Sequence, residues 1–342
     1  MPLFRFNLFF FALLSFITLL AHFFVERFQP TGNELLTTQW QTETSDESQI
    51  DIEQGHIRIF SKNPHDTVSA FQFLQQAPHD QLVLVSAEIR SNDIIRGKET
   101  WHTGMISITQ KIGNKKNQFR PISTMSLTGT NEWKRYEDHF HIPSKAIILF
   151  SIELYKAVGS FEVRNIHFYP VQEAQTYIWS KNIILVLWII FFILLTVSCY
   201  FAEQQSIFLQ FLLIVFFALI VIGTSMQGDI KESIFHTIHS AFNNNHPIFN
   251  LINWLPLDLS KVGHFVFFSG LGCALQLVVR HKKTFEIFTV ILMLACGTEL
   301  TQIYIDGRTP HISDVLIDFV GGTFGILLTR LFSSRNSKLS PG

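Results

Sequence analysis

The chain has 342 residues, of which 47% are apolar and 15% are charged, whereas roughly 25% are charged in soluble proteins. Its formal net charge of -1 gives no global field that would attract nucleic acid, so we expect no nucleic-acid partner. Phe outnumbers Tyr by 35 to 6, a bias typical of lipid-facing segments because the Phe ring needs no hydrogen-bond partner. These totals favour a membrane protein.

The three cysteines, Cys199, Cys273 and Cys296, all lie in apolar segments. The polar part of the chain therefore contains no disulfide. No two cysteines are separated by two residues, so a thiolate metal site is not expected either. We predict neither a metal nor another cofactor.

Six apolar segments approach the length of about 20 residues that crosses the hydrocarbon core of a bilayer. The first, residues 4–25, has a longer apolar run than a secretion signal, and His22, Phe23 and Phe24 stand where a cleavage site would need small residues. We therefore expect residues 1–27 to form an uncleaved anchor and residues 176–342 a multi-span membrane domain. The other five segments are residues 183–201, 207–224, 262–279, 285–304 and 315–332.

The basic residues predict the orientation of these segments. Residues 280–283 (Arg-His-Lys-Lys) join the fourth and fifth segments, and Arg330, Arg335 and Lys338 flank the last one. Short basic loops stay in the cytoplasm. The pattern predicts a multi-pass protein of a bacterial plasma membrane, with both termini in the cytoplasm and residues 28–175 outside.

Residues 28–175 have the pattern of a folded β domain. Residues 82–89 and 105–109 are rich in β-branched side chains, and residues 161–168 alternate between apolar and polar. Turn signals lie at residues 113–114, 128–131 and 158–160. The prediction for the whole chain is a polytopic α-helical membrane protein of about six spans with an inserted all-β sandwich.

Two parts of this domain resemble a known family. Gly129-Thr-Asn-Glu-Trp-Lys-Arg-Tyr136 with Phe140-His-Ile-Pro143, and then residues 159–166, are similar to the second half of carbohydrate-binding, galactose-binding-like jelly rolls. The resemblance covers about residues 39–171 and implies a glycan ligand. Large aromatic residues more often pack in a core, which is our expectation for Trp40, Trp101 and Trp133. An exposed Trp101 would be the candidate for stacking on a sugar ring.

Residues 227–260 precede the fourth segment and predict a short amphipathic helix in the outer interface. His236, His239 and His246 could together hold a metal ion. Few carboxylates accompany them, so solvated interfacial histidines are the preferred interpretation.

The last three segments carry polar residues that a lipid-exposed helix would not tolerate. Helical spacing puts the members of three pairs on one face each. On the predicted orientation these faces and Arg308 lie within one or two turns of the outer surface, at about 1.5 Å per residue. We therefore expect a ligand-binding site made of Lys261 and His264, Glu299 and Gln302, Asp314 and Asp318, and Arg308.

These residues also resemble the VanZ-like family, whose pattern runs Lys-x-x-His-Phe, Glu-x-x-Gln, Gly-Arg and Asp-x-x-x-Asn-x-x-Gly. The chain has Asp318 where the family usually has Asn, and the match covers about residues 258–331. The family is named for a protein that confers low-level resistance to teicoplanin. The resemblance implies a cell-envelope setting and names no reaction.

Three functions remain open at this point. The cations Lys261 and Arg308 could hold the phosphate of a lipid-linked cell-wall precursor, with the sandwich contacting its glycan. A membrane enzyme could instead use His264 as a general base, oriented by Glu299 or Asp314. In the third, the spans only anchor a glycan-binding sensor or scaffold.

A purely structural interpretation also exists for the polar residues. Lys261 and Arg308 could pair with Glu299, Asp314 and Asp318 in an internal salt-bridge network that keeps the helices in register.

Overall fold

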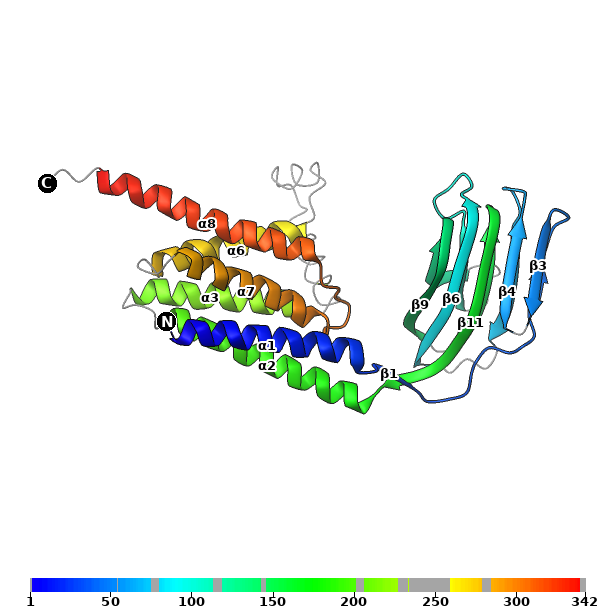
Figure 1. Cartoon of the computed structure of the whole chain (residues 1–342), viewed down its shortest axis with the longest axis horizontal. Helices are drawn as coiled ribbons and strands as arrows, with labels where there is room; N and C mark the ends of the chain where they lie inside the picture. The colour runs from blue at the N-terminus through cyan, green and yellow to red at the C-terminus, as the bar shows by residue number, and fades with distance from the viewer. Residues whose placement is uncertain are drawn as a thin grey trace. The chain divides into compact units, whose positions relative to one another are not determined.

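The structure, a computed structural model, describes residues 2–53, 55–74, 80–112, 119–142, 146–200, 206–226, 233, 259–278 and 284–338. The chain forms two compact units. One, the membrane unit, contains Met1–Val25 and Thr176–Gly342, and the other, the outer domain, contains Glu26–Gln175. The outer domain is thus an insertion between the first two long helices (Figure 1).

The membrane unit consists of long apolar helices. They are α1 (Pro2–Phe24), α2 (Gln175–Tyr200), α3 (Ile207–Ser225), α6 (Leu259–Val278), α7 (Thr284–Gln302) and α8 (Ile312–Lys338). Six helices within the described ranges have the length and apolar composition of membrane spans, as predicted. Helix α2 begins at Gln175 rather than at residue 183, because its first two turns contain polar residues that a hydropathy criterion omits.

Three sequence predictions fall outside the described residues. These are most of the amphipathic segment 227–260 with its three histidines, the turn at residues 113–114 and the basic loop 280–283.

Helix α1 is bonded to its neighbours in the membrane unit. Trp188 Nε1 of α2 donates to Thr18 Oγ1 of α1 at 3.0 Å, and Asn7 Nδ2 donates to Ser198 Oγ of α2 at 2.9 Å. Trp188 and Thr18 are fully buried. A polar pair buried among apolar helices is satisfied only when both helices keep their positions, so it fixes the register of α1 against α2.

Glycines bring α6 and α8 into backbone contact. A Cβ atom on Gly272 of α6 would collide with the Gly322 carbonyl of α8, and one on Gly325 of α8 would collide with the Ser269 carbonyl of α6. One on Gly321 would lie 2.6 Å from the Phe265 carbonyl. Small residues are what allow membrane helices to approach this closely, so these glycines serve packing.

The outer domain is a sandwich of two antiparallel sheets. One has the strand order β3-β4-β11-β6-β9, with β1 added along β11, and the other has the order β2-β5-β10-β7-β8. Figure 1 shows β3, β4, β11, β6 and β9 side by side. The strands are β1 (Phe28–Pro30), β2 (Gln41–Glu43), β3 (Ser48–Glu53), β4 (His56–Ser61), β5 (Thr67–Leu74), β6 (Gln81–Ile95), β7 (Gly104–Ile112), β8 (Phe119–Leu127), β9 (Gly129–Ile142), β10 (Ala146–Tyr155) and β11 (Val158–Glu173).

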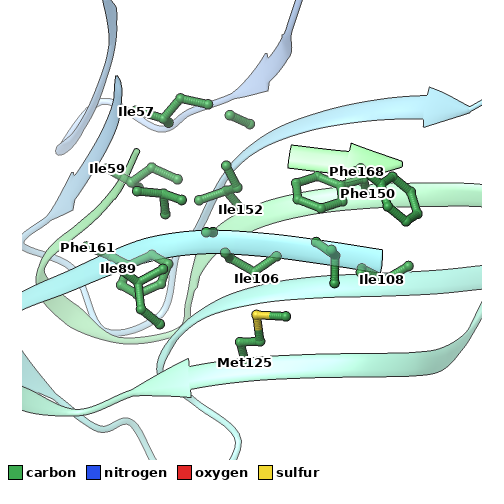
Figure 2. Packing of buried hydrophobic residues seen from close by; sticks show 14 of the residues in the cluster. Ile57, Ile59, Ile89, Ile106, Ile108, Met125, Phe150, Ile152, Phe161 and Phe168 are labelled. Carbon is green, nitrogen blue, oxygen red and sulfur yellow. The ribbon is translucent and has the colours of Figure 1, made fainter. Parts of the chain in front are cut away.

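The core of the outer domain lies between the two sheets, where alternate residues of each strand point inward. Ile89 of β6, Phe150 of β10 and Phe161 of β11 are fully buried there. Figure 2 shows Ile89 next to Phe161, and Phe150 next to Phe168, within this core. The three strands predicted from residues 82–89, 105–109 and 161–168 lie within β6, β7 and β11, which confirms them. A core of this extent explains why the insertion forms a compact unit of its own.

Two of the predicted turns depend on glycine. Gly129 has φ of 69° and Gly159 has φ of 122°, a region that other residues adopt with strain. A Cβ on Gly159 would also lie 2.5 Å from the Asp93 carbonyl oxygen. The turn before β9 lies at Thr128, inside the predicted turn, but residues 129–131 already belong to β9. The turn before β11 lies at Lys156 and Ala157, so the turn predicted at residues 158–160 was placed too late, in the start of β11.

The two ends of the outer domain are held together as adjacent strands. Phe28 of β1 pairs with Glu173 of β11, and the Ala174 N–H donates to the Arg27 carbonyl at 2.9 Å. An ion pair joins Arg27 Nη2 to Glu173 Oε1 at 3.2 Å. The insertion thus enters and leaves through one short paired stem.

Candidate functional site

A buried polar contact of the membrane unit joins α6 to α8. His264 Nδ1 lies 2.9 Å from Asp318 Oδ1, and the two side chains are 10% and 0% exposed. The contact of Gly321 with the Phe265 backbone, adjacent in sequence to His264, lets the two helices come close enough for this pair. The second carboxylate oxygen, Asp318 Oδ2, is buried and has no hydrogen-bond partner within the described ranges.

A second polar contact is centred on Glu299 near the end of α7. Gln302 Nε2 donates to Glu299 Oε1 at 2.9 Å, and the backbone N–H of His311 donates to Glu299 Oε2 at 2.9 Å. Glu299 and Gln302 are buried. Because His311 directly precedes α8, the carboxylate satisfies a free donor at the helix start and fixes α8 to α7.

Asp314 belongs to the same electrostatic group. It is half-buried in the first turn of α8, and both Asp314 and Glu299 lie close enough for their charges to act on the His264 ring. The structure therefore assembles five of the predicted site residues, His264, Glu299, Gln302, Asp314 and Asp318, from three helices. The five comprise one imidazole, three carboxyl groups and one amide.

The two cations of the predicted site are not part of this group. Lys261 is exposed at the start of α6, and Arg308 is half-buried in the segment between α7 and α8. The Arg308 Nε atom is buried, and the side chain has no hydrogen bond or ion pair with any residue that the structure describes. The salt-bridge network considered from the sequence is therefore wrong in its main pairs, because neither cation forms an ion pair with Glu299, Asp314 or Asp318, all of which the structure describes.

The predicted orientation of His264 also needs correction. The sequence pointed to Glu299 or Asp314 as the carboxylate that would orient the imidazole, whereas Asp318 does so. Spacing along each helix was interpreted correctly, but the rotation of α8 against α6 is set by the glycine contacts described above. That rotation turns Asp318 toward α6.

Two groups at this site were missed from the sequence. The first is the backbone N–H of His311, whose role in binding Glu299 has no sequence signal of its own. The second is a buried group in which Tyr304, just after α7, donates its Oη–H to the Thr18 carbonyl of α1 at 3.0 Å, and Trp188 of α2 donates to the Thr18 hydroxyl. The available sequence signal was that each of these residues has a polar atom within an otherwise apolar segment.

The predicted site, with the Arg308 guanidinium, suits an anion better than a metal ion. No group of three or more His, Cys, Asp or Glu side chains with metal-binding geometry occurs among the described residues. A guanidinium with a buried, unpartnered N–H is a strong donor to a phosphate or carboxylate. The His264–Asp318 pair is, in addition, an arrangement that fixes one ring nitrogen and leaves Nε2 for a proton transfer.

The three tryptophans considered for the outer domain have different surroundings. Trp40 packs against the core, where its ring makes an edge contact with Phe150. Trp101 is 59% exposed and touches the His102 ring edge-on. Trp101 is therefore the only one of the three whose ring has mostly open faces.

Trp133 lies outside the buried core, against the expectation that it would pack there. The Arg164 and Arg90 guanidinium carbons lie 4.2 Å and 5.0 Å from its ring centroid. Such cation–π contacts stabilise the ring in a half-exposed position. They also occupy the ring, so Trp133 is not available to stack on a sugar.

Next to Trp133 lies a carboxylate that is surrounded by basic side chains. The Glu162 carboxylate is 5% exposed and has Arg90 at 2.7 Å, His56 at 3.2 Å and Arg58 at 3.9 Å. Arg90 and Arg58 are the direct cross-strand neighbours of Glu162 on β6 and β4. This group stabilises the sheet through its pairs.

Comparison with known families assigns the helical region. The family model described as VanZ/LLP1 matches residues 183–333. This helical region, which is less than half of the chain, is therefore similar to the VanZ/LLP1 family. The VanZ/LLP1 region contains all seven predicted membrane-site residues, whereas α1 and the outer domain lie outside it. None of the curated proteins compared with the chain matches it.

Solved structures similar to the N-terminal part of the chain include carbohydrate-binding modules. One is described as "CBM4 structure and function", at 13% identity and a TM-score of 0.30 over 42% of this chain and 94% of that chain. Another is the CBM22-1 xylan-binding domain from Paenibacillus barcinonensis Xyn10C, at 11% identity and a TM-score of 0.28 over 43% and 99% of the two chains. TmCBM61 in complex with β-1,4-galactotriose has 11% identity and a TM-score of 0.28 over 41% and 99%.

Proposed function

We propose that this multi-pass membrane protein binds the anionic head group of a lipid-linked cell-envelope precursor at the outer leaflet. Arg308 and Lys261 are the cations, and the polar group around His264, Glu299, Gln302, Asp314 and Asp318 is the wall of the site. The observation that carries the proposal is Arg308, whose buried Nε–H has no partner among the described residues.

The energetics of an unpaired guanidinium support this assignment. A charged donor that is withdrawn from water without a partner costs free energy, and Arg cannot lose its proton to avoid that cost. A phosphate or pyrophosphate group would accept two hydrogen bonds from the guanidinium in a fixed geometry. Asp318 and Glu299 are engaged with His264, Gln302 and His311, and neither pairs with Arg308 in the place of such a ligand.

The side of the membrane follows from the basic residues of the sequence. With both termini in the cytoplasm and α1 counted as a span, residues 28–175 and the segment around Arg308 lie outside. Reporter fusions at Asn114 and Gly307 should report an extracytoplasmic position, and a fusion at Lys282 a cytoplasmic one. A cytoplasmic signal at Asn114 would reject the orientation.

The outer domain would bind the glycan of the same class of molecule. Trp101 supports this proposal because an exposed indole at the surface of a β-sandwich can stack on a sugar ring. The teicoplanin resistance for which the VanZ-like family is named makes glycopeptide tolerance a suitable phenotype to measure.

The direct test is mass spectrometry of lipids that co-purify with the gently solubilised full chain. We expect a phosphate-containing lipid with the wild type, less with Arg308→Lys and almost none with Arg308→Ala. Arg135→Ala serves as the matched control, because Arg135 is an exposed arginine of the outer domain. Equal recovery of the same lipids with wild type and Arg308→Ala would reject the proposal.

One observation favours a second candidate, an enzyme that acts on a lipid head group. The His264–Asp318 pair has the geometry of a general base whose ring is oriented by a carboxylate. In that case His264→Ala should retain the co-purifying lipid but abolish its turnover, and Asp318→Asn should reduce turnover strongly. A lipid that remains chemically unchanged in the presence of the wild type would exclude this candidate.

A further inference from the structure

The segment 303–311, which joins α7 to α8 and carries Arg308, is bonded to both helices that flank the outer domain in the chain. Its Tyr304 Oη donates to the Thr18 carbonyl of α1 at 3.0 Å. Its Asp306 Oδ2 lies 3.6 Å from Lys181 Nζ of α2. Only α1 and α2 continue into the outer domain, so the segment contacts the two helices that carry the insertion.

The contact with α1 is buried and its polar atoms are paired. Tyr304 is 2% exposed and Thr18 is 0% exposed. Thr18 also accepts the indole N–H of Trp188 from α2 at 3.0 Å. A hydrogen-bonded group of this kind is stronger in an apolar interior than in water, so it fixes the start of segment 303–311 against both helices.

The other end of the segment is fixed by Glu299. The carboxylate accepts the His311 N–H at 2.9 Å. Between the two ends, the Arg308 N–H donates to the Ile305 carbonyl at 3.2 Å, and Gly307 adopts a positive φ of 71° that closes the turn. Arg308 therefore lies on a short turn whose two sides are bonded to three different helices.

We infer that Tyr304 and Asp306 are positioning residues of the head-group site, which hold Arg308 at a fixed place against α1 and α2. This inference rests on the proposed function, because it assigns how the Arg308 site is kept in its binding geometry. It also makes α1, which lies outside the VanZ/LLP1 region, a component of that site. A turn that is already ordered loses less conformational freedom on binding, and this difference raises affinity.

The test measures binding of farnesyl pyrophosphate to the detergent-solubilised full chain. Farnesol, which lacks the phosphates, and inorganic pyrophosphate, which lacks the lipid chain, show which part of the probe is recognised. Tyr304→Phe removes one hydroxyl and keeps the ring, so we expect affinity to fall about two- to tenfold with little change in melting temperature. Hydrogen exchange of residues 303–311 should become faster in the same variant.

Thr196→Val is the matched control, because it also removes a hydroxyl that bonds to a backbone carbonyl, at 2.8 Å in α2, without contacting the segment. We expect it to leave both affinity and exchange of residues 303–311 unchanged. The ion pair is tested separately by Lys181→Asp, Asp306→Lys and the double exchange. Each single change should weaken binding, and the double exchange should recover part of the loss.

The outcomes separate the inference from the proposed function. If Arg308→Ala abolishes probe binding while Tyr304→Phe and both single charge changes leave it intact, the positioning role is wrong and the head-group site stands. If Arg308→Ala binds like the wild type, the head-group site itself is wrong, and the positioning role with it. If Tyr304→Phe lowers the melting temperature strongly, the charge exchange between Lys181 and Asp306 decides the question. Recovery of binding in the double exchange then supports the positioning role, and absence of recovery overturns it.

Discussion

Glu162 in the outer domain and Arg308 in the membrane unit are both charged residues withdrawn from water, but they differ in the number of oppositely charged partners. In the outer domain, the Glu162 carboxylate is surrounded by Arg90, His56 and Arg58 within 4 Å. In the membrane unit, the Arg308 guanidinium has a buried Nε and no ionic partner among the described residues.

The difference shows what each group does. A buried charge that is fully paired stabilises the fold in which its partners are cross-strand neighbours, and its removal should be felt as lost stability. A charge with no partner contributes little to stability, and its hydrogen-bond donors remain available to a ligand. The predictions below test this division, from the largest expected effect to the smallest.

Glu299→Ala should have the largest effect, because Glu299 is the paired charge of the membrane unit. The change leaves Gln302 and the His311 N–H without their acceptor, at a loss of about 3 kcal/mol of stability. The melting temperature of the detergent-solubilised chain measures it. Glu286→Ala, in the first turn of the same helix, is the control and should melt near wild type. An unchanged melting temperature for Glu299→Ala would show that its hydrogen bonds are not structural.

Glu162→Ala should destabilise the outer domain by about 2 kcal/mol, the value typical of a hydrogen bond to a charged group. Denaturant unfolding of residues 26–175, expressed alone, measures the free energy of unfolding. The control is Glu137→Ala, whose partner Arg135 is 70% exposed and which should lose only about 0–1 kcal/mol. If both variants lose the same free energy of unfolding, the buried pairs of Glu162 do not stabilise the sheet more than an exposed ion pair does.

Arg308→Ala should change the free energy of unfolding by only about 0–1 kcal/mol, because the half-buried guanidinium has no ion pair to lose among the described residues, while glycopeptide tolerance is lost. The Arg308 and Glu299 side chains share no contact within the described part of the chain. The double variant Glu299→Ala/Arg308→Ala should therefore equal the sum of the single effects within about 0.5 kcal/mol. Rescue of Glu299→Ala by the second change would instead reveal a salt bridge between them and reject the head-group site.

Glu153 of β10 should give the smallest effect, seen as a pH dependence of the outer domain. Burial raises the pKa of its carboxyl above the ordinary value of 4.5, and the hydrogen bond from Ser151 opposes this only partly. The folded state then holds the proton more tightly than the unfolded state, so stability falls as pH rises from about 4.5 through the raised pKa. Glu153→Gln should remove this part of the pH dependence and be the more stable form at neutral pH. A pH profile identical to that of the wild type would contradict the assignment.

The elements that follow from local pattern could be predicted. Long apolar runs gave the six helices, and period-two runs with flanking glycines gave β6, β7 and β11. Strands β3 and β4 were not identified, because Ser48–Glu53 and His56–Ser61 are short and mix charged residues with isoleucines. The place of β4 depends on pairing with β11, which is distant in sequence, and β3 pairs in turn with β4 at the edge of the sheet.

The candidate site shows the same limit. Helical spacing correctly placed Glu299 and Gln302 on one face, and their side chains are bonded to each other. The partner of His264 could not be derived, because it depends on how α8 is rotated against α6. The binding of Glu299 to a backbone N–H of His311 could not be derived either, since every residue except proline has that group.

The glycine contacts between α6 and α8 have a mechanical consequence. Backbone atoms of one helix fill the positions that Cβ atoms of the other would occupy at Gly272, Gly321 and Gly325. A slide of either helix by one turn would place larger side chains against that backbone, so the two helices can move only as one rigid body. Lys261, His264 and Asp318 then travel together, and their mutual distances stay constant in any rearrangement. If the site adjusts to ligands of different size, the movement must come from α7 or from residues 303–311. Helix α7 contacts Gly322 of α8 through the Ile291 side chain rather than through backbone atoms, so it can shift more easily.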